Sequence, residues 1–133
     1  MNPADYGVHT NFRTMPNGEV RLGLAADDGS AYTRTISAAD AWQNSHYHAS
    51  YTEIYVVQTE RVVLATLIDD ELALTIYEAG QHFVVPAGVA HNIFQTKDAV
   101  THNVKFGGDD LTDWHAVTAL DDLVQSLTKK ELF

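Results

Sequence analysis

The sequence predicts an all-β fold, a small antiparallel sandwich or barrel with one short C-terminal α-helix. The chain has 133 residues, which suits a single domain with its own core. Short segments rich in Val, Ile, Thr, Tyr and Phe follow one another along most of the chain, and several alternate apolar with polar residues. Turn-forming residues separate these segments at close spacing, which is typical of antiparallel sheets.

Seven segments are predicted to be strands, and each lies between residues that favour turns. The turn signals include residues 16–18 (PNG), 69–70 (DD) and 86–88 (PAG). β-Branched and aromatic residues dominate the segments because they pack well on a pleated surface. The predicted strands are residues 18–25, 31–37, 52–57, 61–68, 71–77, 81–86 and 101–106.

One α-helix is expected near the C-terminus, at about residues 119–130. Two aspartates in its first turn and two lysines at its end suit the helix dipole. Its apolar residues recur at helical spacing and form one stripe, which we expect to pack against the outside of the barrel. The stripe consists of Leu120, Leu123, Val124 and Leu127.

Composition and charge argue against several classes of protein. Cysteine is absent, which excludes disulfides and thiolate metal sites, so a metal would need nitrogen and oxygen ligands. The net charge of -10 would repel phosphate backbones, so nucleic-acid binding is not expected. The first residues do not resemble a signal peptide, and no apolar run approaches membrane-spanning length. We therefore expect a cytoplasmic protein without membrane contact.

The first segment that carries chemistry contains two histidines and a glutamate. His46 and His48 are two residues apart, so on a strand they project from the same face. Glu53 follows after a step that is long enough for a tight turn into the next strand. Such a turn would return its carboxylate to a place beside the two imidazoles.

The second segment is residues 80–91 (GQHFVVPAGVAH). Pro86 and Gly88 suit a sharp turn, which places His91 near the start of another strand. Three neutral imidazoles and one carboxylate suit Mn, Fe, Co, Ni or Zn, and on an octahedral ion they would leave two positions for water, substrate or dioxygen. The sequence thus predicts one divalent metal ion, with no other cofactor. Its ligands would be His46, His48, Glu53 and His91.

The two segments resemble the two sequence motifs of the cupin superfamily. HxH, four residues and E resemble the first motif, at about residues 45–60, and G, five residues, PxG, two residues and H resemble the second, at about 80–95. The resemblance implies one small cupin domain (a monocupin) over residues 1–133, a double-stranded β-helix (jelly-roll) barrel with the metal inside its mouth. The departures lie at turns. Asp40 and Glu60 replace usual glycines of the first motif, and Gln95 replaces a frequent asparagine of the second.

Strand alternation suggests further residues of the pocket. If Glu53 points inward, Tyr55 does too, where its phenol would donate to a substrate, act as an acid, or simply fill the barrel. In residues 100–106 the even positions are the more apolar, so we expect them to face inward, with His102 in the pocket and Lys105 outside. His102 is then a candidate acid or base, since its ordinary pKa of ~6.5 suits that task. The alternative is a core histidine with satisfied hydrogen bonds.

The fold does not fix the function, because cupins host many activities. The favoured interpretation is a metal-dependent isomerase, epimerase or cyclase that acts on a small sugar-like or polyketide-like carbonyl compound, with the ion as Lewis acid. The alternatives are an iron-dependent dioxygenase and a non-catalytic module that binds metal or a small ligand. No arginine or lysine has a definite inward position, which disfavours a strongly phosphorylated substrate. The expected partners are a small molecule and a second copy of the chain, because small cupins commonly form homodimers through outer strands.

Overall fold

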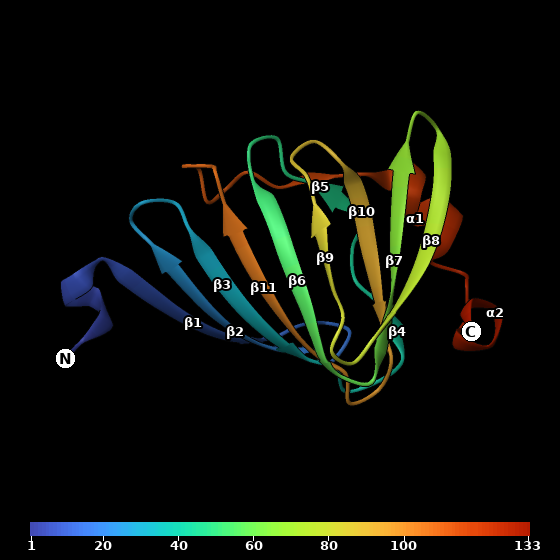
Figure 1. Ribbon diagram of the computed structural model, residues 1–133, viewed down its shortest axis with the longest axis horizontal. Coiled ribbons are helices and arrows are strands. Elements are labelled where there is room, and N and C mark those ends of the chain that lie inside the picture. The colour runs from blue at the N-terminus through green and yellow to red at the C-terminus, as the bar shows by residue number, and fades with distance from the viewer.

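The computed structural model describes all 133 residues and consists mainly of two antiparallel sheets, with short helices at the C-terminal end (Figure 1). The first sheet has the order β1 (Val8–Thr14), β2 (Val20–Ala26), β3 (Ala31–Ile36), β11 (Val100–Phe106), β6 (Thr52–Thr59) and β9 (His82–Val85). The second has the order β12 (His115–Ala116), β5 (His46–Tyr47), β10 (Ala90–Gln95), β7 (Arg61–Ile68) and β8 (Glu71–Glu78), with β4 (Ala41–Trp42) paired to β10. The all-β jelly-roll class expected from the sequence is confirmed.

The seven predicted segments all contain a strand, but β1 was not predicted. β1 follows a short 3-10 helix (Pro3–Tyr6) and pairs only with β2, at the edge of the first sheet. Six of its seven residues are exposed, so it lacks the apolar alternation that marks a half-buried strand. Its place in the fold comes from pairing with β2 along its whole length, which a single-strand pattern does not reveal.

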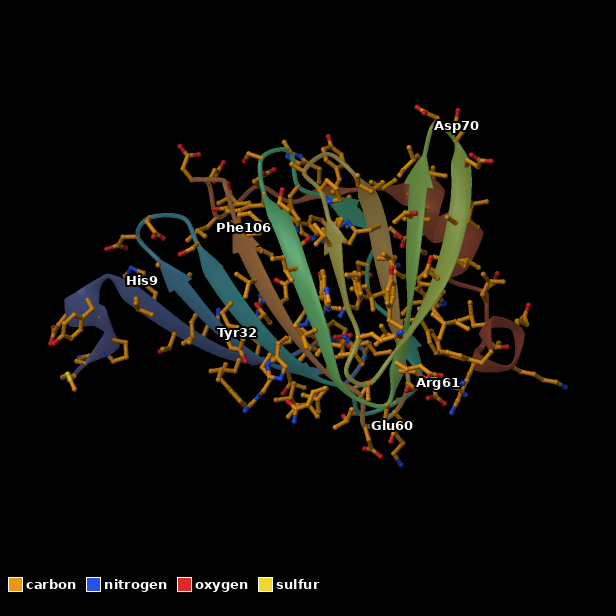
Figure 2. All side chains as sticks on the ribbon, in the orientation of Figure 1. His9, Tyr32, Glu60, Arg61, Asp70 and Phe106 are labelled. Atoms are coloured by element: carbon orange, nitrogen blue, oxygen red, sulfur yellow. The ribbon has the colours of Figure 1, made fainter.

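Two hairpins show how the chain turns without glycine. The β6–β7 hairpin has Glu60 at a φ of 60°, which is the left-handed region that usually takes glycine. Glu60 is the position where the first motif usually has glycine, so the turn geometry is kept with a different residue. The β7–β8 hairpin turns through Asp69 and Asp70, which have φ values of 52° and 61°. Figure 2 labels Glu60 and Asp70 at opposite ends of the sheets.

The space between the sheets holds an apolar cluster to which both sheets contribute. Val57 and Phe83 come from the first sheet, and Val62 and Ile93 from the second. All four side chains are buried, since their exposed fractions are 5% or less. This cluster is the hydrophobic core that fixes the two sheets face to face.

The C-terminal segment forms two short helices where one was expected, α1 (Thr118–Val124) and α2 (Lys129–Leu132). Thr128 begins the second helix with a capping box that it shares with Glu131, and this start separates α2 from α1. Leu120 and Val124 of the expected stripe are fully buried against the outer side of β7 and β10. Leu123, in contrast, is exposed. None of the helices has the length and apolar character needed to cross a membrane.

Strand β7 is apolar on both faces, and the chain itself covers both. Val62 and Leu64 point into the core between the sheets, whereas Val63 and Ala65 pack under the C-terminal helices. The apolar residues on both faces of β7 are therefore covered within one chain.

Candidate metal centre

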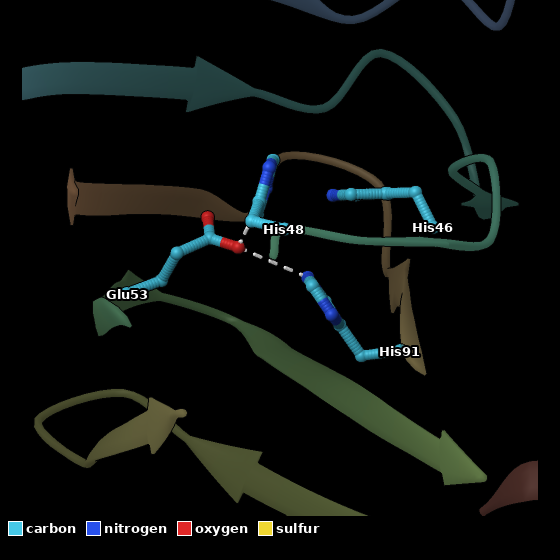
Figure 3. Close-up of side chains that lie close together, drawn as sticks. All are labelled: His46, His48, Glu53 and His91. Atoms are coloured by element: carbon cyan, nitrogen blue, oxygen red, sulfur yellow. Dashed lines mark ion pairs between the residues drawn. The ribbon is translucent and has the colours of Figure 1, made fainter. Parts of the chain in front are cut away.

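The structure brings together the four residues that the two motifs single out. His46 lies on β5, His48 directly follows that strand, Glu53 lies on β6 and His91 on β10. One ligand atom from each of them lies within 4.8 Å of the others, and Figure 3 shows the four side chains pointing toward one another. His91 and His46 are paired across β10 and β5, so sheet register places two of the imidazoles side by side.

Hydrogen bonds to the backbone orient each imidazole. A carbonyl oxygen only accepts hydrogen bonds, so the ring nitrogen that faces it, Nδ1, carries a proton. In a neutral ring Nε2 then keeps its lone pair, which is the state that binds a metal. The three Nδ1–H groups donate to the carbonyls of Asn44 (from His46), Asp113 (from His48) and Val89 (from His91).

One oxygen of the Glu53 carboxylate accepts hydrogen bonds that fix the group, and the other oxygen faces the histidines. Oε2 accepts hydrogen bonds from the Tyr55 hydroxyl at 2.9 Å and from Asn103 Nδ2 at 2.8 Å. Oε1 lies 3.0 Å from His48 Nε2 and 3.1 Å from His91 Nε2. Oε1 and both of these nitrogens are buried, and none of them has a hydrogen-bond partner with good geometry. Lone pairs that face one another in this way fit a bound cation, so the group can hold one divalent metal ion.

The electrostatics keep the site in a form that suits a cation. Burial would by itself raise the pKa of Glu53, but the adjacent rings of His48 and His91, when protonated, outweigh it and hold that pKa well below its usual range. Burial disfavours the charged ring and is the main cause that lowers the pKa of His46 to about 4. At neutral pH the site thus has an ionised carboxylate and a neutral His46 ring, as metal binding requires. The His46 ring also stacks on Trp114, with centroids 5.3 Å apart.

A cavity of about 650 Å³ lies beside the cluster. Its wall includes His46, His48 and Glu53, together with residues of β1, β2, β3 and β11 and of the segment 111–114. A volume of this size is within the range of sites that enclose small molecules. The cluster therefore borders a space in which a small ligand can reach it.

The expected inward face of β11 is wrong. His102 lies on the outer face, where its Nδ1 is 2.6 Å from the Tyr32 hydroxyl and its Nε2 contacts Gln58 Oε1. Asn103 and Lys105 face inward and line the cavity. The expectation failed because the inward side of this strand borders a polar cavity, whereas its apolar residues point outward.

Tyr55 does face inward, as strand alternation from Glu53 predicts. Its side chain is buried, its ring stacks on Phe83 with centroids 4.9 Å apart, and its hydroxyl donates to Glu53. Burial and the adjacent carboxylate raise the pKa of Tyr55 well above its usual range. The hydroxyl thus stays protonated and is committed to Glu53.

Three residues that the sequence did not single out also belong to the site. Asn103 holds Glu53, and it was missed because the faces of β11 were assigned in reverse. The Asp113 carboxylate accepts hydrogen bonds from the N–H groups of Ala49 and Ser50, which fixes the turn between His48 and Glu53. Tyr51 lies in the cavity wall, and its buried hydroxyl has no hydrogen-bond partner. Asp113 and Tyr51 lie in irregular segments, where no periodic pattern identifies them.

No protein-family model matches the sequence, and no similar sequence was found among curated proteins. Solved structures, however, are similar. An oxalate oxidase superposes with a TM-score of 0.64 and 23% identity, over 78% of this chain and 57% of that one. The oxalate decarboxylase of Bacillus subtilis, which has Mn(II) centres, gives 0.70 and 15%, over 82% of this chain and 30% of that one. KdgF from Halomonas sp. gives 0.63 and 16%, over 75% of this chain and 88% of that one. The chain thus spans little more than half of the oxidase and under a third of the decarboxylase.

Proposed function

We infer that this chain, which has the cupin fold of these three structures, is a metalloenzyme that binds one divalent ion through His46, His48, Glu53 and His91. The supporting observation is that Glu53 Oε1, His48 Nε2 and His91 Nε2 are buried, face one another and lack hydrogen-bond partners. Leaving such groups unpaired is costly, and a shared cation satisfies all of them at once.

We propose that the reaction is of the isomerase, epimerase or cyclase type, on a small sugar-like or polyketide-like carbonyl compound. When bound, the ion supplies Lewis acidity toward adjacent oxygens of such a compound. The cluster borders a cavity of about 650 Å³, which is large enough to admit a small molecule. A substrate in this cavity would meet the metal and the residues of β11 together.

We assign the proton-donating role to Tyr51, because His102 lies on the outer face. The Tyr51 ring packs edge-on against His48, with centroids 6.2 Å apart. Burial, with the charges of nearby aspartates, raises the pKa of Tyr51, so the hydroxyl keeps its proton at neutral pH. Tyr55 and Asn103 are positioning residues in this proposal, since both hold Oε2 of Glu53 and thereby direct Oε1 toward the ion.

Metal analysis of the purified protein and of two histidine variants tests the ligand assignment. His91→Ala removes a fully buried ligand, and we expect its metal content to fall from one ion per chain to near none. His82→Ala is the matched control, because His82 is exposed on β9 and takes no part in the cluster. Stoichiometric metal in His91→Ala would refute the ligand assignment.

Turnover without dioxygen tests the reaction class. An isomerase, epimerase or cyclase should work anaerobically and with redox-inert zinc, and Tyr51→Phe should lower its turnover while the metal is retained. Mn²⁺ is the first ion to load, because the similar decarboxylase of Bacillus subtilis has Mn(II) centres. Consumption of dioxygen would instead assign the chain to the iron-dependent dioxygenases, and a metal-loaded protein with neither activity would be a binding module.

We also propose that two copies of the chain pair through the outer face of β11, β6 and β9. Val84, Val56, Val104 and Phe106 are exposed on this face, each by more than 40%. The outward positions of the three strands carry no acidic side chain, although the chain has 18 acidic residues, so two copies can meet there without repulsion between carboxylates.

The particle mass in solution, measured by light scattering, tests this pairing. The wild-type protein should have twice the chain mass, and Val104→Glu should have the mass of one chain, because each copy would bring a buried charge to the interface. Leu74→Glu is the control, since Leu74 is as exposed but lies on β8 of the other sheet. A wild-type particle with the mass of one chain would contradict the pairing.

A further inference from the structure

The cavity beside the candidate metal centre gathers basic side chains, in contrast to the acidic chain as a whole. The sequence has 18 acidic and 8 basic residues, yet three of the eight, Arg13, Arg21 and Lys105, line this one cavity. Its acidic side chains are Glu53 and Asp113. Glu53 faces the imidazoles, and Asp113 is occupied by two backbone N–H groups and a serine hydroxyl. The expectation that no arginine or lysine faces the lumen is therefore wrong.

The two arginines stand opposite each other on neighbouring strands. Arg13 of β1 is the direct cross-strand partner of Arg21 of β2, an arrangement of like charges that destabilises a sheet. Arg21 is partly compensated by Glu19, whose Oε2 lies 3.1 Å from the guanidinium. Arg13 has no ion pair and is exposed at the cavity wall. The guanidinium of Arg13 is therefore free to contact a ligand in the cavity.

Lys105 is the half-buried cation of the cavity. On β11 it stands directly opposite Glu53 of β6, which places it next to the cluster. Its ammonium makes no ion pair and no hydrogen bond. An ammonium in these surroundings is short of a counter-charge, because burying a cation is costly unless it is paired.

We propose that Lys105, assisted by Arg13, binds the carboxylate of a small organic anion whose neighbouring oxygen reaches the metal centre. The proposal rests on the proposed function, since it names the substrate class of the same site. A carboxylate fits better than a phosphate. Phosphates favour several free arginine forks, whereas Arg21 is engaged by Glu19 and only Arg13 is free. Lys105 offers a single, partly desolvated positive charge, which one carboxylate balances.

Calorimetric titration of the metal-loaded protein with glycolate and with its neutral amide, glycolamide, tests the proposal. Glycolate should bind about tenfold more tightly than glycolamide, as a charge-assisted contact predicts. Lys105→Met keeps the length of the side chain and removes its charge, and it should weaken glycolate about tenfold without changing metal content or glycolamide binding. Lys105→Arg should retain most of the preference. Lys97→Met, on the exposed β10–β11 turn, is the control and should change nothing.

Two results would overturn the proposal. One is equal glycolate affinity in Lys105→Met and wild type, and the other is tighter binding of inorganic phosphate than of glycolate. The same titrations on protein stripped of metal separate this proposal from the one on which it rests. A wild-type protein that takes up no metal contradicts the proposed function, whereas a glycolate preference that depends on Lys105 in the stripped protein would still support the anion site.

Discussion

The interior of this barrel has an apolar part and a polar part. In the apolar part the strands point mainly apolar residues inward, and in the polar part they point polar residues inward. The apolar part lies between β6 and β9 of one sheet and β7 and β10 of the other, and it is closed by Val57, Phe83 and Ile93. The polar part is the cavity, bounded by β1, β2, β3 and β11 and by the metal cluster. Tyr55 joins them, because its ring stacks on Phe83 in the core while its hydroxyl holds Glu53.

The two parts differ in whether the apolar residues of a strand identify its inward face. On β6 and β9 the buried residues are mostly the apolar ones, so the usual rule holds. On β11 the buried residues are Thr101 and Asn103, and Val104 and Phe106 point outward. A strand that borders a functional cavity therefore places its polar residues inside, and its apolar face is left for the surface.

Among variants that change only one of the two parts, Phe83→Ala is expected to have the largest effect on the free energy of unfolding. It removes a ring that is packed between Tyr55 and Tyr77 in the apolar part, so the free energy of unfolding should fall by about 3–5 kcal/mol. The loss should be the same in metal-free and metal-loaded protein, measured by urea denaturation. If the two parts are independent, the variant still binds one ion per chain. Loss of metal in the folded variant would show that the core positions the ligands.

A smaller effect is expected from Asn103→Ala in the polar part. Without its amide the Glu53 carboxylate loses one of the two hydrogen bonds that hold Oε2, so metal affinity should fall about 10- to 100-fold. Competition with a chelator of known affinity measures the change. Val104→Ala is the neighbouring control, since its side chain points outward and is 42% exposed. Equal metal affinity in the two variants would contradict the positioning role of Asn103.

The sequence predicted the fold class and the grouping of the four candidate ligands because both depend on short-range spacing. His46 and His48 share a strand face, and the turn residues around Pro86 bring His91 to the start of β10. Glu60 shows that a departure from the family pattern at a turn leaves the turn intact, because the residue adopts the left-handed conformation itself.

The features that could not be predicted from the sequence depend on contacts between distant segments. β1 becomes a strand by pairing with β2, and only that pairing brings Arg13 to the cavity wall. Asp113 follows β11 in an irregular segment, and its contact with the turn after His48 spans more than 60 residues. The faces of β11 depend on whether the space beside it is filled or hollow, which no local pattern encodes.

The smallest effect expected is that of His102→Ala on the outer face of β11. The substitution removes the hydrogen bonds to Tyr32 and Gln58, so the free energy of unfolding should fall by about 1 kcal/mol. Metal content and turnover should match the wild type, because His102 points away from the cavity that Asn103 and Lys105 line. Urea denaturation and metal analysis on one preparation give both quantities. A variant of normal stability that had lost turnover would return the acid–base role to His102, and it would mean that the outer face of this strand takes part in the chemistry.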